Sequence, residues 1–229
     1  MRKLLLVLSI FSVASTAFAQ HKIDKDYDWV MYDKYETANT KVTKSPDVIL
    51  MGDSITEFWE IRDPEFFKEH PNILNRGISS QVTTQMLARF QNDVIELNPK
   101  VVVITAGTND VAHNNGAIAL PNIVKQIKSM CEIARFHGIV PIICSVPPCN
   151  KFFWMPQERP ARTIIELNTL LKEYAVSAGI MYVDFHSAMA AEDGSMIEEY
   201  TFDGCHPSTA GYKVMEKVLL PHINSALDF

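Results

Sequence analysis

The chain has 229 residues, of which 47% are hydrophobic and 21% charged, an ordinary composition for a globular protein with a sizeable core. Its formal net charge is −6, from 27 acidic and 21 basic residues with histidine counted as neutral. An acidic chain without a basic cluster is a poor candidate for binding nucleic acid or an anionic lipid surface. Composition excludes those two partner classes and leaves a small-molecule or glycan substrate open.

The first nineteen residues have the composition of an export signal. Arg2 and Lys3 form a basic start, and the apolar run LLLVLSIFSVA follows. The sequence AFA at 17–19 has small residues at the two positions that a signal peptidase reads, so we expect cleavage after Ala19. The apolar run is short for a membrane span. We therefore expect an exported protein, periplasmic or secreted, with a single domain over 20–229 and no membrane insertion in its mature form.

Five short apolar runs predict strands, and most of them are continuous rather than alternating. Such runs are typical of strands that are buried on both faces of a parallel sheet. They are DVILM at 47–51, NILN at 72–75, VVVIT at 101–105, IVPIIC at 139–144 and IMYVD at 180–184.

Amphipathic segments of helical length separate these strands. Apolar residues recur at helical spacing over 120–137 and 161–178, and glycines at 138 and 179 predict where those helices stop. Further helices are expected over 24–44 and 209–226. This alternation predicts a three-layer α/β/α fold with right-handed crossovers, in which ligands bind beyond the carboxyl ends of the strands.

Small and polar residues stand where the predicted strands end. They are Gly52-Asp53-Ser54, Asn75-Arg76-Gly77, Gly107-Thr108-Asn109-Asp110 and, before the last helix, Asp203-Gly204-Cys205-His206. Taken singly, each is explained as a helix cap or a turn. Taken together, they supply the parts that an ester-cleaving serine needs.

Those parts are a nucleophile, a base, an acid and an oxyanion site. Ser54 offers the hydroxyl and His206 the base, and Asp203 lies three residues before His206, near enough to fold back onto its ring. The backbone N–H groups of Ser54 and Gly77 and the side-chain amide of Asn109 are candidate oxyanion donors. We interpret Gly77 as leaving room for substrate against the backbone.

The motifs GDSIT, NRGIS, GTND and DGCHP resemble, in order and place, the four signature blocks of the SGNH hydrolases, the GDSL esterase/lipase family. The resemblance spans roughly residues 47–220. It implies a flavodoxin-like five-stranded parallel sheet, no metal and no organic cofactor. It also implies the roles just given: catalytic Ser54, Asp203 and His206, with oxyanion donors Ser54, Gly77 and Asn109. The first block has isoleucine where the family name has leucine.

Three neighbouring residues receive supporting roles. We interpret Asp53 and Asp110 as hydrogen-bonding supports of their loops, and Cys205 as a small buried filler. Cysteine spacings match no metal site. Export would permit disulfides, yet the sequence gives no ground for predicting one, and the redox state stays open for Cys131, Cys144, Cys149 and Cys205.

Other classes fit less well. An α/β-hydrolase would need a second glycine where Thr56 stands, and neither a G-x-G-x-x-G motif nor a P-loop is present. A non-enzymatic glycan-binding domain of the same fold stays open, although such a domain would not need both the serine and the histidine.

Aromatic residues near the predicted site are candidate substrate contacts. Phe58 and Trp59 lie about one helical turn beyond Ser54, and Phe152, Phe153 and Trp154 follow a predicted strand. Aromatic walls suit sugar faces or acyl chains. No lid segment is evident. We therefore predict a serine esterase that removes short acyl groups, acetyl above all, from carbohydrates or related O-acetylated compounds. A lysophospholipase or thioesterase is the alternative.

Overall fold

A computed structural model of the protein describes residues 28–228, so the expected export signal lies outside the described residues. Five parallel strands form one sheet in the order β2-β1-β3-β4-β5, the flavodoxin-like order that the family resemblance implied. The strands are β1 (Val48–Gly52), β2 (Ile73–Gly77), β3 (Val101–Thr105), β4 (Val140–Cys144) and β5 (Met181–Val183). All five were predicted, but β2 runs two residues further than expected, to Gly77.

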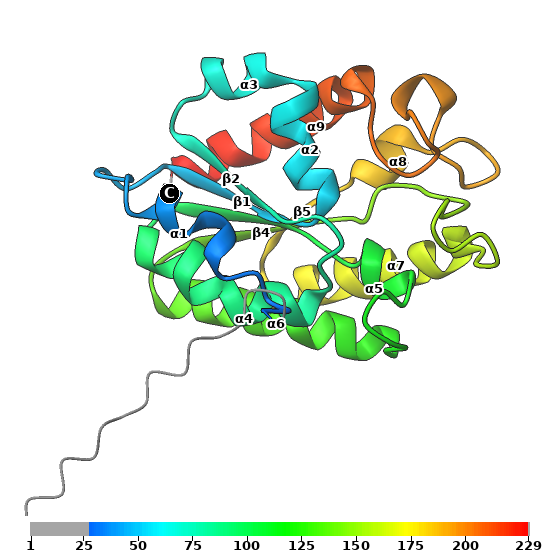
Figure 1. Cartoon of the computed structure of the whole chain (residues 1–229), viewed down its shortest axis with the longest axis horizontal. Coiled ribbons are helices and arrows are strands. Elements are labelled where there is room, and N and C mark those ends of the chain that lie inside the picture. The colour runs from blue at the N-terminus through cyan, green and yellow to red at the C-terminus, as the bar shows by residue number, and fades with distance from the viewer. Residues whose placement is uncertain (1–27, 229) are drawn as a thin grey trace, which may run out of the picture.

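Helices cover both faces of this sheet (Figure 1). One face carries α2 (Ser54–Arg62), α3 (Pro64–Glu69), α8 (Phe185–Met189) and α9 (Thr209–Leu227). The other carries α4 (Thr83–Asp93), α6 (Leu120–Phe136) and α7 (Pro160–Ala178), with the short α5 (Thr108–Val111) at the end of β3. The three-layer prediction is therefore confirmed.

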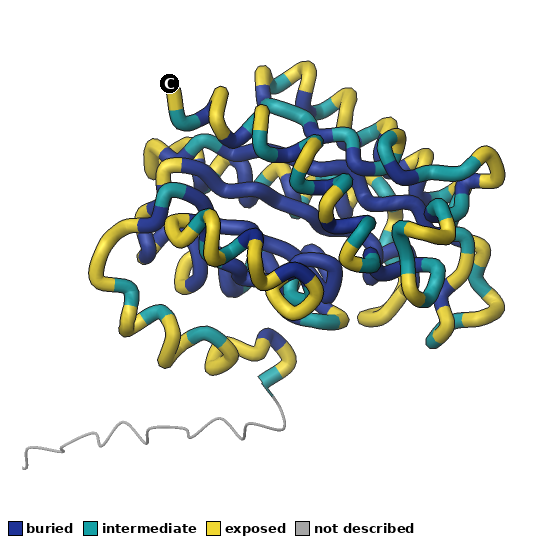
Figure 2. The backbone as a smooth tube through the Cα atoms, turned by 90° about the horizontal axis from the view of Figure 1, so that it is seen from above, coloured by how far each residue is buried: buried dark blue, intermediate teal, exposed yellow. Residues whose placement is uncertain are grey.

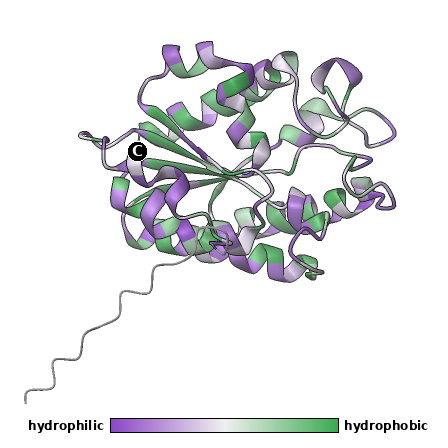
Figure 3. Ribbon diagram, in the orientation of Figure 1, coloured by the Kyte–Doolittle hydropathy of each residue, from purple (hydrophilic) through white to green (hydrophobic). Residues whose placement is uncertain are grey.

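Alternate strand residues explain why both faces are covered. In β1, Ile49 and Met51 belong to the buried cluster to which α4, α6 and α7 contribute, whereas Val48 and Leu50 belong to the cluster to which α2, α3, α8 and α9 contribute. These side chains are at most 2% exposed. The buried strands lie in the middle of the molecule (Figure 2), and they are its most continuously hydrophobic segments (Figure 3). Burying apolar area on both faces is the main stabilising contribution of such a sheet.

The leading helix is much shorter than predicted. We expected a helix over 24–44, but α1 spans only Asp33–Asn39. Before it, the Asp28 carboxylate accepts the backbone N–H groups of Met31 and Tyr32, and Met31 has a left-handed backbone with φ of 58°. This turn separates α1 from the chain before it, because a left-handed residue cannot continue an α-helix. Residues 24–27 of the prediction lie outside the described part of the chain.

The long helices otherwise match their predicted spans. α7 ends before Gly179, whose φ of 61° is the left-handed conformation that glycine adopts readily. Within residues 28–228, no helix is both long enough and apolar enough to cross a bilayer.

Candidate active site

Close packing at the carboxyl end of β1 places Ser54 just beyond the end of this strand. The Asp53 carboxylate caps α2 by accepting the Ile55 N–H at 2.9 Å, so the helix begins at Ser54. A Cβ on Gly52 would stand 2.0 Å from the Thr56 hydroxyl oxygen, and only glycine permits that approach. The hydroxyl of Ser54 thus lies at the carboxyl end of the sheet, and its N–H is one of the donors that a helix start leaves unpaired.

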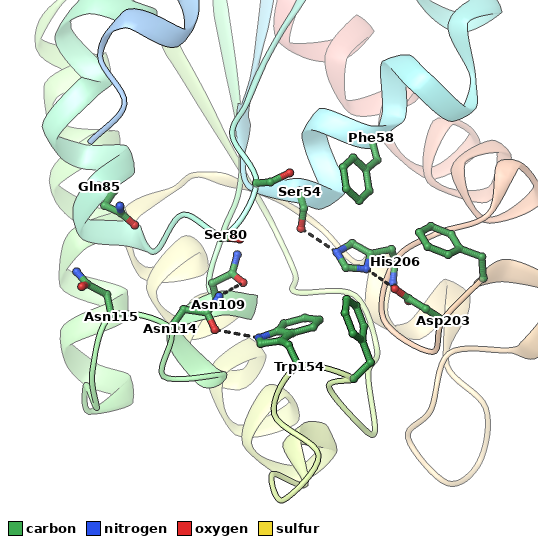
Figure 4. Close-up of a pocket in the computed structure, with 13 residues that line it drawn as sticks. Ser54, Phe58, Ser80, Gln85, Asn109, Asn114, Asn115, Trp154, Asp203 and His206 are labelled. Carbon is green, nitrogen blue, oxygen red and sulfur yellow. Dashed lines mark hydrogen bonds and ion pairs between the residues drawn. The ribbon is translucent and has the colours of Figure 1, made fainter. Parts of the chain in front are cut away.

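The loop before α9 brings His206 and Asp203 to this serine. Ser54 Oγ lies 2.9 Å from His206 Nε2, and His206 Nδ1 lies 2.7 Å from Asp203 Oδ2 (Figure 4). The second oxygen of Asp203 accepts the backbone N–H groups of Cys205, at 2.9 Å, and His206, at 2.7 Å. These two backbone bonds fold the carboxylate back onto the ring, as the three-residue spacing predicted.

The charge of Asp203 fixes the direction of these bonds. Burial acts to raise the pKa of this carboxyl, but hydrogen bonds from the His206 ring and from the two backbone N–H groups outweigh it and hold the pKa below its usual value. An ionised carboxylate only accepts, so His206 Nδ1 carries the proton in the neutral ring. His206 Nε2 is then the acceptor for the Ser54 hydroxyl.

Asn109 lies at the start of α5, on the side of Ser54 away from His206 (Figure 4). Its amide nitrogen lies 3.1 Å from the Gln81 carbonyl oxygen and 3.3 Å from Asp53 Oδ2. Burial raises the pKa of Asp53 to about 6. Asp110 accepts the hydroxyl and the backbone N–H of Thr83. The interpretation of Asp53 and Asp110 as loop supports is confirmed.

Gly77 is not placed as the sequence predicted. It is the last residue of β2, its N–H donates to Asn75 Oδ1 at 2.8 Å, and it does not line the pocket. A Cβ there would stand 2.2 Å from the backbone nitrogen of Glu57 in α2. The glycine therefore lets α2 pack against β2, and our interpretation that it leaves room for substrate is wrong.

Ser80 has the position that we assigned to Gly77. It lines the pocket beside Asn109, and no acceptor for its N–H lies within the described residues. Its φ of 66° is left-handed, which turns the backbone at this point. Sequence reasoning missed Ser80 because it placed the end of β2 two residues early and because a serine, unlike a glycine, does not signal this conformation.

A pocket of about 630 Å³ opens over Ser54, and one side of it is aromatic. Its rings come from α2, from the loop between β4 and α7, and from the loop before α9, and all lie around the imidazole of His206. They are Phe58, Phe153, Trp154 and Phe202, with ring centroids 5.2 to 6.3 Å from that of His206.

Two of the predicted substrate contacts are wrong, and one aromatic residue of the pocket was missed. Trp59 is 2% exposed and stacks between Phe66 and Tyr212 in the core. Phe152 is fully buried and supports Trp154 from behind. Phe58, which the sequence indicated together with Trp59, lines the pocket, and so does Phe202, which was missed. Adjacency to Asp203 could have indicated Phe202.

The other side of the pocket is polar and carries no cation. Side-chain amides and hydroxyls line it, from Ser79, Ser80, Gln85, Asn114 and Asn115. Asp203 is the only charged carboxylate among the lining residues, and its charge is directed to His206. This polar side of the pocket can therefore hydrogen-bond neutral hydroxyl groups but has no positive charge to pair with a phosphate.

All four cysteines are free thiols and are buried. Cys205, between Asp203 and His206, is 1% exposed, which agrees with its interpretation as a filler. Among the residues that the structure describes, no cluster of three or more His, Cys, Asp or Glu side chains is placed to hold a metal.

Fold and site together define a class: a parallel α/β protein whose Ser54, His206 and Asp203 form one hydrogen-bonded line at the carboxyl edge of the sheet, the arrangement that serine hydrolases use. A model of the GDSL-like lipase/acylhydrolase family matches residues 50–214. The chain belongs to this family.

Individual relatives are similar to the chain to different extents. The crystal structure of a protein from Bacteroides fragilis NCTC 9343, named as an acylhydrolase, superposes with a TM-score of 0.84 at 39% identity, over 87% of this chain and 99% of that one. Lipoprotein YqeF of Bacillus subtilis is 31% identical over 130 residues, 50% of this chain, which spans only 54% of that protein. Acetylxylan esterase of Geobacillus stearothermophilus is 24% identical over 66% of this chain and 71% of that protein.

Proposed function

We propose that the protein is a serine esterase that forms an acyl-enzyme on Ser54. The observation that carries this proposal is the line from Ser54 Oγ through His206 to Asp203, with contacts of 2.9 and 2.7 Å. In a neutral ring held by Asp203, Nε2 is unprotonated and ready to accept the serine proton.

The reaction runs in two halves. Ser54 Oγ attacks the ester carbonyl carbon while His206 Nε2 takes its proton, and the tetrahedral intermediate collapses as His206 returns that proton to the departing alcohol. Water then attacks the acyl group on Ser54 with His206 as base, which releases the carboxylic acid and restores the serine. Asp203 keeps the ring in one tautomer and stabilises its charged form.

The oxyanion of the intermediate is held by three donors. The Ser54 N–H lies at the positive end of α2, the Ser80 N–H has no acceptor in the described part of the chain, and the Asn109 amide lies on the same side of the pocket. To reach the oxyanion, the Asn109 NH₂ group gives up one of its long contacts to Gln81 or Asp53.

The alcohol part of the substrate is a sugar, and the acyl part is short, acetyl above all. An aromatic wall suits the apolar face of a sugar ring, and the facing amides and hydroxyls suit its hydroxyl groups. The acetylxylan esterase relative supports this choice. The absence of a lining cation among the described residues disfavours the alternative lysophospholipid, whose phosphate would have no ion pair in the pocket lining.

A substrate panel tests both levels of the proposal. We expect turnover of p-nitrophenyl acetate and of acetylated xylo-oligosaccharides, with kcat/KM falling as the acyl chain of the aryl ester lengthens from acetyl to octanoyl. Ser54→Ala is the matched control and should be inactive on every ester. Activity that rises steadily to octanoyl, or that is highest on lysophosphatidylcholine, would overturn the substrate assignment. A wild type that hydrolyses no activated ester would overturn the esterase itself and favour a glycan-binding domain.

A further inference from the structure

A chain of three side chains connects the aromatic wall to the oxyanion side of the pocket (Figure 4). The Trp154 indole N–H donates to Asn114 Oδ1 at 2.9 Å, and Asn114 Nδ2 donates to Asn109 Oδ1 at 2.7 Å. The Asn114 backbone N–H also donates to the Asn109 carbonyl, at 3.0 Å. The loop after α5 is thereby tied to Asn109 twice.

The chemistry of its outer end fixes the direction of this chain. An indole nitrogen can donate a hydrogen bond but cannot accept one. The Asn114 atom that faces Trp154 is therefore its oxygen, and its NH₂ group faces Asn109. The Asn109 atom that meets this NH₂ is then its oxygen, which leaves its own NH₂ on the side of Gln81 and Asp53, toward the pocket.

This direction matters most when the oxyanion forms. In the free protein, Gln81 and Asp53 also hold the Asn109 NH₂ group. When the Asn109 NH₂ group redirects one of these hydrogen bonds to the oxyanion, the hydrogen bond from Asn114 to Asn109 Oδ1 remains. It still fixes the oxygen end of the amide. An Asn109 amide rotated by 180° would present its oxygen to the negatively charged oxyanion. The larger the population with the rotated amide, the lower the rate of acylation.

The indole is itself held in place. The backbone N–H of Met155 donates to the Phe152 carbonyl at 3.2 Å, which closes a turn with Phe153 and Trp154 at its tip. The buried ring of Phe152 anchors that turn, 4.8 Å from the Trp154 ring. The ring of Trp154 lies 5.9 Å from the imidazole of His206, centroid to centroid, while its N–H reaches Asn114, so one side chain connects the His206 side of the pocket to the Asn109 side.

We propose that Asn114 and Trp154 are positioning residues for Asn109: through two successive hydrogen bonds, the indole of the aromatic wall keeps the Asn109 amide turned toward the oxyanion. This rests on the proposed esterase function. Trp154 then has two separable roles, stacking on the substrate through its ring and orienting Asn109 through its N–H.

A double-mutant cycle tests whether Asn114 acts through Asn109. With p-nitrophenyl acetate, which is too small to need the whole wall, Asn114→Ala should lower kcat by about five- to twentyfold and leave KM within about twofold, since a donor is misoriented rather than removed. In an Asn109→Ala background the same substitution should change kcat by less than about twofold. Equal losses in both backgrounds, or a loss in KM alone, would overturn the proposal. Asn122→Ala, an exposed asparagine on α6, is the matched control.

Trp154→Phe separates the N–H from the ring. It keeps an aromatic face but has no donor, so kcat on the aryl acetate should fall by about the same factor as in Asn114→Ala. Trp29→Phe is the matched control: this tryptophan is exposed and does not line the pocket, and its backbone carbonyl, which accepts from the pocket residue Gln85, is kept by the substitution. Wild-type kcat in Trp154→Phe would overturn the extension of the chain to the indole.

One readout does not depend on turnover. The Trp154 indole N–H resonance, followed by ¹⁵N NMR, should shift and exchange faster with solvent in Asn114→Ala but not in Asn122→Ala. An unchanged resonance would contradict the hydrogen bond itself. If the wild type proves inactive, the esterase proposal fails while this measurement still decides whether the side-chain chain exists.

Discussion

At the scale of single residues, Gly77 and Ser80 lie in different surroundings from those that the motif around them indicates. Gly77 stands in a motif shared with esterases, yet its missing side chain serves the packing of α2 against β2. Ser80, three residues later, has the left-handed backbone and lies at the pocket with its N–H unpaired within the described residues. The proposed reaction needs a backbone donor, and the path of the backbone, not the residue type, determines which residue can supply it.

Gly77→Ala separates these interpretations. Since the φ of this strand residue is ordinary, the cost arises from a Cβ pressed against backbone atoms at 2.2 to 2.8 Å. We expect the free energy of unfolding to fall by about 2 kcal/mol or more, as for other overpacked cores. Urea unfolding measures it.

Gly138→Ala is the comparison variant, because Gly138 has a φ of 74° and nothing within 4 Å of a new Cβ. Its free energy of unfolding should fall by only about 1 kcal/mol, the cost of a left-handed backbone in a residue with a Cβ. A Gly77→Ala protein of unchanged stability but sharply lower kcat would show that Gly77 is an oxyanion residue after all.

At the scale of elements, the strands and long helices were predictable because their apolar runs and glycine stops are local signals. The leading helix was not, since a carboxylate turn at Asp28 and a left-handed Met31 interrupt a sequence whose composition permits a helix. The end of β2 was also missed by two residues. That small error had a large consequence, because it moved a candidate site residue from the strand into a loop.

The N-terminus of α2 also gives a pH prediction. Burial raises the pKa of Asp53 from 3.8 to about 6. Between these values the folded protein holds a proton that the unfolded chain has lost, so stability falls as pH rises through this window. Below pH 3.8 both states are protonated, and well above pH 6 both are ionised.

The variant Asp53→Asn removes this titration. The stability of the wild type relative to the variant should therefore increase by on the order of 2 kcal/mol as pH falls from 7 to 4.5. Asp203, whose pKa is lowered, acts in the opposite direction, but it is present in both proteins and cancels from the difference. Urea unfolding at the two pH values measures it. A pH-independent difference would show that Asp53 is ionised across this range.

At the scale of the whole molecule, the site joins residues that are far apart in the sequence. Ser54 follows β1, Asn109 follows β3, Trp154 follows β4, and Asp203 with His206 precede α9. In a parallel sheet the carboxyl ends of all strands lie at the same end of the sheet, so these segments meet there. The sequence alone could therefore predict that the serine, asparagine, aspartate and histidine lie close together.

What the sequence could not do was separate aromatic residues that face the pocket from those that face the core. Trp59 and Phe58 are adjacent, and so are Phe152 and Phe153, yet one member of each pair is buried and the other lines the pocket. Neighbouring residues on a helix or a turn point in different directions, and one residue of shift in either segment would exchange the two roles.

The acyl-enzyme proposal is tested most directly by covalent labelling of the serine. An alkyl fluorophosphonate requires an activated hydroxyl, so the intact wild-type protein should gain one adduct, and peptide mapping should locate it on Ser54. His206→Ala, which keeps the serine but removes its base, should label far more slowly, and Ser54→Ala not at all. An active wild type that stays unlabelled at Ser54, or that labels equally fast without His206, would contradict an acyl-enzyme on a Ser54 activated by His206.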